Sequence, residues 1–341
     1  MAERSAPDAS AHAPSPEPAR DAKTQLLRTK WQRAQAKGVP EAELIWNYAR
    51  PLFEALIERG EADAARALWR EELRDGAALG SLQPMNRLQL LRNRIRLAEI
   101  EASPDTWYRV GQRYFNEASL ASELGHAGAD REIFVAHLEM GAALQAMGDL
   151  EGALVEYRKG LTVIRKLANA DRDHLALRSD LAVAQDRVGD VLRAQGDMPA
   201  SLLAYRSSQG IRKMLVEAEP GNPIWRRDLS VSHGKVGNIM RAQGQLDGAL
   251  KAYRDSLARI EQLQQESPHN LDLKADGGVV ELKIGDVLRA QGHLPAALDA
   301  YERAHATYTH LVENSARSAW QRVKAMAETR TTIVRSALDA S

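Results

Sequence analysis

A short segment that recurs at a fixed step restricts the fold of this chain more than any other feature. The segment reads GDVLRAQGDMPASLLAY from Gly189, and it returns as GNIMRAQGQLDGALKAY from Gly237 and as GDVLRAQGHLPAALDAY from Gly285. A looser copy, GAALQAMGDLEGALVEY, begins at Gly141. Each copy starts 48 residues after the one before it. A fixed period of this size is typical of stacked repeats, in which each unit buries its apolar face against its neighbours.

Each repeat is predicted to form two long antiparallel helices joined by a tight turn. In the third repeat we expect helices over 224–243 and 246–266, with the turn at Gly244. A further glycine recurs in mid-helix, where glycine costs about 1 kcal/mol relative to alanine. We infer that the second helix approaches the first too closely there for a side chain. The mid-helix glycines are Gly141, Gly189, Gly237 and Gly285, and the small residues that face them on the second helix are Ala153, Ser201, Ala249 and Ala297. The tyrosines expected to pack over the crossing are Tyr157, Tyr205, Tyr253 and Tyr301.

The spacing of these residues resembles the tetratricopeptide repeat (TPR). The match runs from the mid-helix Gly189 to the turn glycine Gly196, the small residue Ser201 and the aromatic Tyr205, and it holds in four units over about 127–318. The resemblance implies an all-α fold, a right-handed α-solenoid of antiparallel helix pairs. It also implies that the first helix of each pair lines a concave face, which holds extended peptides or partner helices. The usual period is about 34 residues. Longer helices explain the longer step of this chain.

The chain divides by composition and register into four predicted parts. Residues 1–20 are rich in alanine, proline and serine and cannot bury enough apolar surface to order, so they predict a disordered tail. Residues 21–126 have helical patterns without the repeat register, and we expect a helical N-terminal module that caps the array. Residues 127–318 form the four repeats. Residues 319–341 contain no turn glycine and predict a C-terminal capping helix.

The N-terminal module is predicted to contain five helices. Pro51 lies within the second of them, so a kink or break is expected near Arg50. The aromatic residues of the last helix are expected in the core, and four arginines of the fourth are expected on a solvated face with Glu99 and Glu101. The five helices are expected over 24–37, 41–59, 62–75, 86–100 and 104–124, and a loop is expected over 76–84. The aromatic residues of the last helix are Trp107, Tyr108, Tyr114 and Phe115, and the arginines of the fourth are Arg87, Arg92, Arg94 and Arg96.

Charge and composition exclude several classes of function. Lys+Arg and Asp+Glu both total 46, so the chain lacks the basic excess of a dedicated nucleic-acid binder. It has no cysteine, which excludes disulfides, thiolate nucleophiles and cysteine-based zinc sites. No apolar run has the length of a membrane span, and the N-terminus lacks the apolar core of a secretory signal. We therefore expect a cytoplasmic protein that does not contact membranes.

Enzymatic motifs are also missing from the sequence. It contains no HExxH, no GxxxxGK[ST] and no GxSxG, and repeat packing explains its glycines. His137 and His233 occupy equivalent positions two units apart, too far to share one metal ion, and His305 and His310 have a poor spacing for ligands on one helix. We expect no catalytic residues, no metal and no cofactor.

Three rows of polar residues on the first helices form the candidate binding site. Stacking of the units would make each row a ladder across the concave face, and arginine can hold a carboxylate with two hydrogen bonds. We therefore expect a protein or peptide partner, with an acidic or C-terminal segment. The alternative is that Asp190/Arg193 and Asp286/Arg289 are ordinary i,i+3 pairs on an exposed face. The rows are Arg187, Lys235 and Lys283, then Asp190, Asn238 and Asp286, then Arg193, Arg241 and Arg289.

The sequence leaves three functions open. The first is a protein-interaction scaffold or adaptor that binds a peptide or partner helix in the concave groove. The second is a regulatory or sensor subunit of a bacterial-type signalling system, in which residues 21–126 bind a partner. The third is an RNA-binding helical array, which the neutral charge and the lack of base-stacking aromatics on the first helices disfavour.

Overall fold

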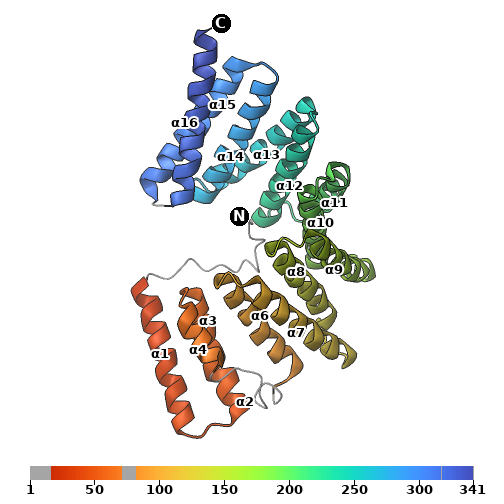
Figure 1. Cartoon of the computed structure of the whole chain (residues 1–341), viewed down its shortest axis with the longest axis vertical. Helices are drawn as coiled ribbons and strands as arrows, with labels where there is room; N and C mark the ends of the chain where they lie inside the picture. Colours follow the sequence, from red (N-terminus) through yellow and green to blue (C-terminus); the bar gives the residue numbers. More distant parts are fainter. Residues whose placement is uncertain (1–16, 71–81, 316, 341) are drawn as a thin grey trace. The chain divides into compact units, whose positions relative to one another are not determined.

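The computed structural model describes residues 17–70, 82–315 and 317–340, and the regular structure within these ranges is helical, without strands. Within each of two compact units, long helices that follow one another in the sequence pack as antiparallel neighbours (Figure 1). The two units comprise residues 1–171 and 172–341. None of the helices in the described ranges is both long and apolar enough to cross a membrane. The predicted all-α fold of tandem antiparallel helix pairs is confirmed.

The first unit begins with short or interrupted helices. α1 (Glu17–Ala36) is followed by α2 (Glu41–Leu44), the π-helical turn η1 (Ile45–Ala49) and α3 (Arg50–Glu58). The segment stays helical through Arg50, so the break predicted there is absent; instead the α-helical pattern is interrupted by the wider π turn, which ends just before Pro51 in the first turn of α3. The disordered tail predicted over 1–20 is wrong for residues 17–20, which are helical, and its residues 1–16 lie outside the described ranges.

The rest of the first unit is built from α4 and two long helix pairs. The helices are α4 (Ala62–Leu68), α6 (Pro84–Ile100), α7 (Pro104–Glu123), α8 (Ala129–Ala146) and α9 (Leu150–Ala170). α6 begins slightly earlier than predicted, because Pro84 fits the first helical turn. The loop predicted over 76–84 falls mostly outside the described ranges. α7 packs between α6 and α8, so residues predicted as a cap continue the pattern of paired helices.

Close helix approach and aromatic packing hold the first unit together. A Cβ atom on Gly111 of α7 would lie 2.9 Å from Cγ of Met140 on α8. Tyr114 is fully buried beside Leu91 and Ile95 of α6, as predicted for the core, while Trp107 and Phe115 pack half-buried around this cluster. A separate core forms where Ile45, Phe53 and Leu56 meet Leu90 and Leu97 of α6.

The second unit contains three helix pairs and a final single helix. We call the first members of the pairs A helices and the second members B helices. Their bounds are α10 (Leu175–Ala194) and α11 (Met198–Ala218), α12 (Pro223–Ala242) and α13 (Leu246–Glu266), α14 (Leu271–Ala290) and α15 (Leu294–Asn314), and then α16 (Ser318–Asp339). Asn222 and Asn270 cap α12 and α14, because each side-chain oxygen accepts two backbone N–H groups. The turn glycines have left-handed φ values, from +74° at Gly244 to +86° at Gly196.

The mid-helix glycines mark the crossing of each pair, as predicted. A Cβ atom on Gly189 would lie 2.8 Å from Cε1 of Tyr205, and one on Gly237 would lie 2.7 Å from Cε1 of Tyr253. The facing Ser201 is fully buried, and its hydroxyl donates to the Gly189 carbonyl at 2.8 Å. The ring of the tyrosine thus fills the space that a side chain would need.

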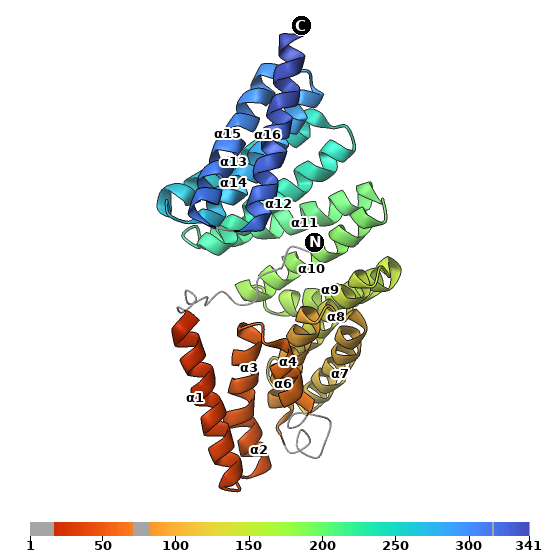
Figure 2. The same ribbon diagram turned by 60° about the vertical axis from the view of Figure 1, so that its left-hand side comes forward.

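The helix α16 closes the second unit against α15 (Figure 2). Trp320, Ala327 and Val334 are buried, and the last two belong to the same core as Val287 of α14. The register of α16 is shifted by one position, since Trp320 and Arg330 each stand one place short of a full repeat step from Leu273 and Lys283. A helix lies where the capping helix was predicted over 319–341, with an observed range of Ser318–Asp339.

Candidate functional site

The predicted binding residues lie on one stripe of the A helices in the second unit. On α14 the stripe contains Asp276, Val279, Lys283, Asp286 and Arg289. Steps of three or four residues keep side chains on one side of an α-helix, so these five positions share a face. The equivalent positions of α10 and α12 carry the same types of residue. We call this stripe, on α10, α12 and α14, the A face.

Each tyrosine of the crossing donates its hydroxyl to the A face. The Tyr205 hydroxyl donates to Oδ1 of Asp190 at 2.5 Å. The amino group of Lys235, on the next A helix, donates to both carboxylate oxygens of Asp190 at 3.1 Å and lies 5.2 Å from the centre of the Tyr205 ring. Burial, reinforced by Asp190, raises the pKa of the Tyr205 hydroxyl. This contact of Tyr205, Asp190 and Lys235, which we call the tyrosine junction, therefore keeps the Tyr205 hydroxyl protonated.

The next two pairs repeat this junction with changes of residue. The Tyr253 hydroxyl donates to Oδ1 of Asn238 at 2.8 Å, and the Lys283 amino group lies 6.0 Å from the centre of the Tyr253 ring. The Tyr301 hydroxyl donates to Oδ1 of Asp286 at 2.9 Å. Burial, followed by Asp286, raises the pKa of Tyr301 to about 12.

Ion pairs connect each A helix to the next one. Lys235 joins α12 to Asp190 on α10, and Arg227 of α12 joins Asp276 on α14 at 2.7 Å. Arg330 of α16 donates to Asp286 on α14 at 2.8 Å from Nε and at 3.2 Å from Nη2. The recorded ion pairs of Asp190 and Asp286 thus run between helices, which is not the i,i+3 arrangement that the sequence left as an alternative.

The structure places the nine predicted residues together but divides their roles. Asp190, Asn238, Asp286 and Lys235 are half-buried. The first three accept a hydrogen bond from the tyrosine of their own helix pair, and Lys235 joins α12 to Asp190 on α10. Arg187 and Lys283 are also half-buried. Arg193, Arg241 and Arg289 are exposed, and each offsets part of the rise in the pKa of its neighbouring tyrosine, so each guanidinium lies beside that hydroxyl.

On each of α10, α12 and α14, the last three of the five positions of the A face together carry an excess of positive charge. Together with Arg330 of α16 they present seven cations against the two carboxylates of Asp190 and Asp286. A further ion pair, Asp186 with Arg212 at 2.7 Å, is buried beneath them and adds no net charge. We call these three positions on α10, α12 and α14, with Arg330, the basic part of the A face. The seven cations are Arg187, Arg193, Lys235, Arg241, Lys283, Arg289 and Arg330.

Two further rows on the A face were missed by the sequence analysis. An acidic row, Asp180, Asp228 and Asp276, precedes a valine row by one helical turn, and both rows keep the step of the repeats. Val231 is 42% exposed, and Met326 extends the row onto α16 with 48% exposure. The signal was present in the sequence, since extending the repeat alignment towards the N-terminus of each A helix finds it. The valines are Val183, Val231 and Val279.

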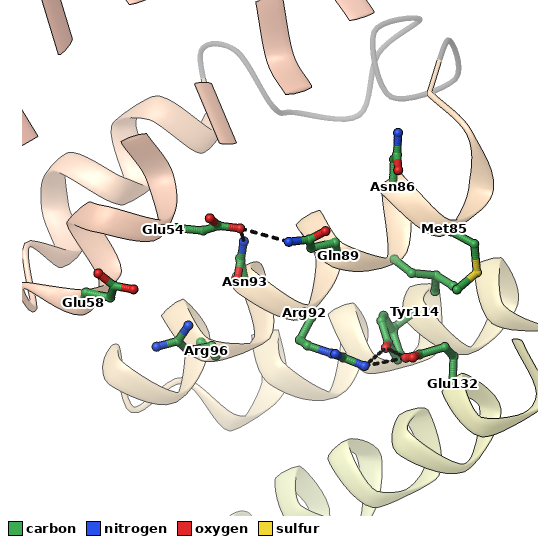
Figure 3. Close-up of a pocket in the computed structure, with 11 residues that line it drawn as sticks. Glu54, Glu58, Met85, Asn86, Gln89, Arg92, Asn93, Arg96, Tyr114 and Glu132 are labelled. Carbon is green, nitrogen blue, oxygen red and sulfur yellow. Dashed lines mark hydrogen bonds and ion pairs between the residues drawn. The ribbon is translucent and has the colours of Figure 1, made fainter. Parts of the chain in front are cut away.

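The first unit has its own tyrosine junction, which Figure 3 shows at one end of a pocket. Arg92 of α6 donates to the Tyr114 hydroxyl at 2.9 Å and to Glu132 of α8 at 2.5 Å, and the Tyr114 hydroxyl donates to the same carboxylate. Two other arginines of α6 pair similarly, Arg94 with Glu101 at 3.2 Å and Arg87 with Glu117 at 2.7 Å. The predicted pairing with Glu101 is therefore present at Arg94, but the predicted solvent exposure is wrong for Arg87 and Arg94, which are half-buried.

Among the described residues of the first unit, one buried histidine, His137, contacts a carboxylate. His137 Nδ1 lies 2.8 Å from Oε2 of Glu156, and Lys159 donates to the other oxygen at 2.7 Å. Burial raises the pKa of Glu156, but Lys159 and His137 together bring it below its ordinary value. Across the described ranges, no group of three or more His, Asp or Glu side chains is arranged to hold a metal ion.

Comparison with known proteins identifies the architecture. No protein-family model matches the sequence, and no curated protein matches it. Solved structures do match. The quorum sensor NprR from B. thuringiensis, in its apo form, aligns with a TM-score of 0.55 and 14% identity over 91% of this chain and 80% of its own. The fold is a TPR-like α-solenoid.

Two other solved structures share this fold. The apo form of RapI aligns with a TM-score of 0.54 and 13% identity, over 87% of this chain and 72% of its own. BtubC (BKLC) from P. vanneervenii aligns with a TM-score of 0.52 and 14% identity, over 74% of this chain and 91% of its own. At these identities the likeness concerns the TPR-like fold alone.

Proposed function

We propose that this chain is a protein-interaction scaffold, and that the A face of its second unit binds an acidic peptide or an acidic partner helix. The observation that carries the proposal is the excess of seven cations over two carboxylates on the basic part of the A face. Three of these cations, Arg193, Arg241 and Arg289, are exposed and stand one per repeat. A row of guanidinium groups can hold successive carboxylates, each with two hydrogen bonds.

The neighbouring rows define the partner further. The valine row gives an extended or helical partner a place for apolar side chains beside its acidic ones, because Val231 and Met326 are exposed. The acidic row beyond it would repel an acidic segment placed in the opposite direction. The preferred partner therefore has acidic residues on the side of the arginines and apolar residues beside them.

We also propose that the array is a long-unit variant of the TPR. In the second unit α12 has 20 residues and α13 has 21, and the other two pairs have the same lengths. Two helices of this length cannot fit in the usual repeat of about 34 residues. The additional residues lengthen both helices of a pair, so each A helix offers a longer stripe to a partner.

Fluorescence anisotropy with a labelled peptide tests the proposed function. The probe is a short peptide of alternating glutamate and leucine, and its control replaces glutamate with glutamine. We expect the triple variant Arg193→Glu, Arg241→Glu and Arg289→Glu to weaken binding of the acidic peptide by at least about tenfold, since each lost charged hydrogen bond contributes about 1 kcal/mol or more. Equal binding of the two peptides by the wild type would contradict the proposal.

A matched control separates the site from the net charge. Arg158, Arg206 and Arg254 are exposed at equivalent positions of three successive repeats, on α9 of the first unit and on the B helices α11 and α13, and their reversal to glutamate changes the charge of the chain equally. This control variant should bind the acidic peptide like the wild type. If both triple variants lose binding to the same extent, the attraction is a general effect of charge and the A face is not the site.

A regulatory or sensor subunit is the second candidate, because NprR, a quorum sensor, has this fold. Hydrogen exchange distinguishes the two functions. In a sensor, binding of the acidic peptide to the second unit changes the exchange of amides in the first unit, through a change in a two-state element. In a scaffold, protection is limited to α10, α12, α14 and α16.

A further inference from the structure

A pocket in the first unit, separate from the A face, contains two charges for which the described residues supply no strong partner. It lies between α3 and α6, with Tyr114 and Glu132 at one end, and has a volume of about 460 Å³ (Figure 3). Pockets that bind small molecules are typically about 300–1,000 Å³. We call it the α3–α6 pocket.

Most of the charges around the α3–α6 pocket are satisfied within the protein. Glu54 accepts hydrogen bonds from Arg50 at 3.0 Å, from Asn93 at 3.0 Å and from Gln89 at 3.3 Å. Arg92 is held by Tyr114 and Glu132. These groups form a fixed polar wall, since each has partners that orient it.

Arg96 and Glu58 differ from these groups, because neither has a strong partner among the described residues. Each follows the satisfied residue of its own helix by four positions, Arg96 after Arg92 on α6 and Glu58 after Glu54 on α3, so each lies one turn further along the same side. Both line the pocket, and Figure 3 shows them at the end away from Tyr114. Within the described ranges, the other three arginines of α6 have ion pairs, while none is recorded for Arg96.

Glu58 has only a weak partner among the described residues. Its recorded cation is Lys23, whose amino group lies 4.0 Å from Oε2, with 65% and 56% of the lysine and glutamate side chains exposed. An exposed pair at this distance contributes little to stability and is screened by salt. The pocket therefore has a guanidinium available to a ligand on one wall and a weakly paired carboxylate on the other.

We propose that the α3–α6 pocket binds a small zwitterion, a free α-amino acid or a dipeptide. The carboxylate of the ligand binds the Arg96 guanidinium, and its ammonium group binds the Glu58 carboxylate. A simple anion would face Glu58 as well as Arg96, and a simple amine would face Arg96 as well as Glu58. A zwitterion is the class of ligand that matches both walls, and the planar guanidinium can hold its carboxylate with two hydrogen bonds.

Isothermal titration calorimetry on the full chain tests the proposal with the standard free L-amino acids, glycylglycine and alanylalanine as probes. We expect at least one probe to bind, and we expect its N-acetyl derivative and its methyl ester each to bind at least about tenfold more weakly, the loss of one charged contact. If only amino acids bind, the pocket is specific for the shorter ligand, and if only dipeptides bind, it is specific for the longer one.

Variants locate the site. Arg96→Gln and Glu58→Gln should each weaken binding of the best probe by at least about tenfold. The matched controls Arg165→Gln and Glu123→Gln, exposed on α9 and α7, should leave binding unchanged. The proposal is overturned if no probe binds, or if the N-acetyl derivative or the ester binds as well as its parent. It is equally overturned if the pocket variants bind like the controls. The derivative series needs only the wild-type chain, so it does not depend on the folding of any variant.

Discussion

The substitution Gly237→Ala tests whether the helix crossings of the second unit need glycine. Gly237 lies in the middle of α12, where a Cβ atom would be 2.7, 2.9 and 3.2 Å from three carbons of the Tyr253 ring. The ring cannot move aside easily, because it is fully buried and its hydroxyl donates to Asn238. Overpacking of this kind costs about 1–3 kcal/mol. Alanine in place of a mid-helix glycine gains back about 1 kcal/mol of helix propensity.

Gly210 provides a matched control in the neighbouring helix. It lies in the middle of α11, and a Cβ atom there would meet nothing within 4 Å. Gly210→Ala should therefore show the gain in helix propensity alone, and raise the free energy of unfolding by about 0.5–1 kcal/mol. Because the propensity effect is common to both variants, the difference between them isolates the cost of overpacking, about 1–3 kcal/mol.

Urea and thermal denaturation followed by circular dichroism measure this difference. For a unit of this size we expect Gly237→Ala to melt at least about 2 °C below Gly210→Ala, at about 2–4 °C for each kcal/mol. In a Tyr253→Leu background, which removes the ring, Gly237→Ala should become neutral or stabilising. The reasoning is refuted if Gly237→Ala stabilises the wild-type chain as much as Gly210→Ala does, because the crossing would then have room for a methyl group.

Two further predictions concern buried polar groups of the second unit. Arg212→Ile should lower the free energy of unfolding by up to about 3–5 kcal/mol, since it leaves the buried Asp186 carboxylate with only the Lys235 amino group, 3.6 Å away, as a cation. Adding Asp186→Leu should recover most of that loss in chemical denaturation, as Leu282 occupies the equivalent position two repeats on; a double variant as unstable as the single one would contradict this. The pKa of Tyr301 is about 12 in the folded chain and about 10 when unfolded, so its contribution to stability is complete below pH 10 and is lost as the pH rises towards 12. Tyr301→Phe should reduce the fall in stability over that interval, and an unchanged slope would show that another group causes it.

The fold of the array could be predicted closely from the sequence because its signals are local. Asn222, Pro223, Gly244 and the mid-helix Gly237 each fix a cap, a first turn, a helix end or a crossing within a few residues of themselves. Prediction failed where pairing depends on contacts between elements. The pair α6/α7 lacks the 48-residue register of the repeats, and it packs onto α8 through the close approach of Gly111 to Met140.

The candidate site was predicted only in part for the same reason. The rows of cations and acids can be read from the step of the repeats, but the sequence does not show which of these side chains are paired within the protein. Whether Asp190 is free or held depends on Lys235, which lies 45 residues away and reaches it only once α12 has packed beside α10. The two weakly satisfied charges of the α3–α6 pocket, Arg96 and Glu58, belong to helices that are far apart in the sequence and carry no repeated motif.

The packing of α16 against α14 and α15 has a practical consequence for anyone who shortens this chain. A version that ends before Ser318 would remove Arg330 from Asp286 and uncover buried apolar side chains, among them Tyr308 and Leu311, which pack with Trp320. Such an uncovered apolar surface promotes aggregation. Truncated versions made for binding assays should therefore keep α16, and a loss of solubility after its removal should not be interpreted as the loss of a binding partner.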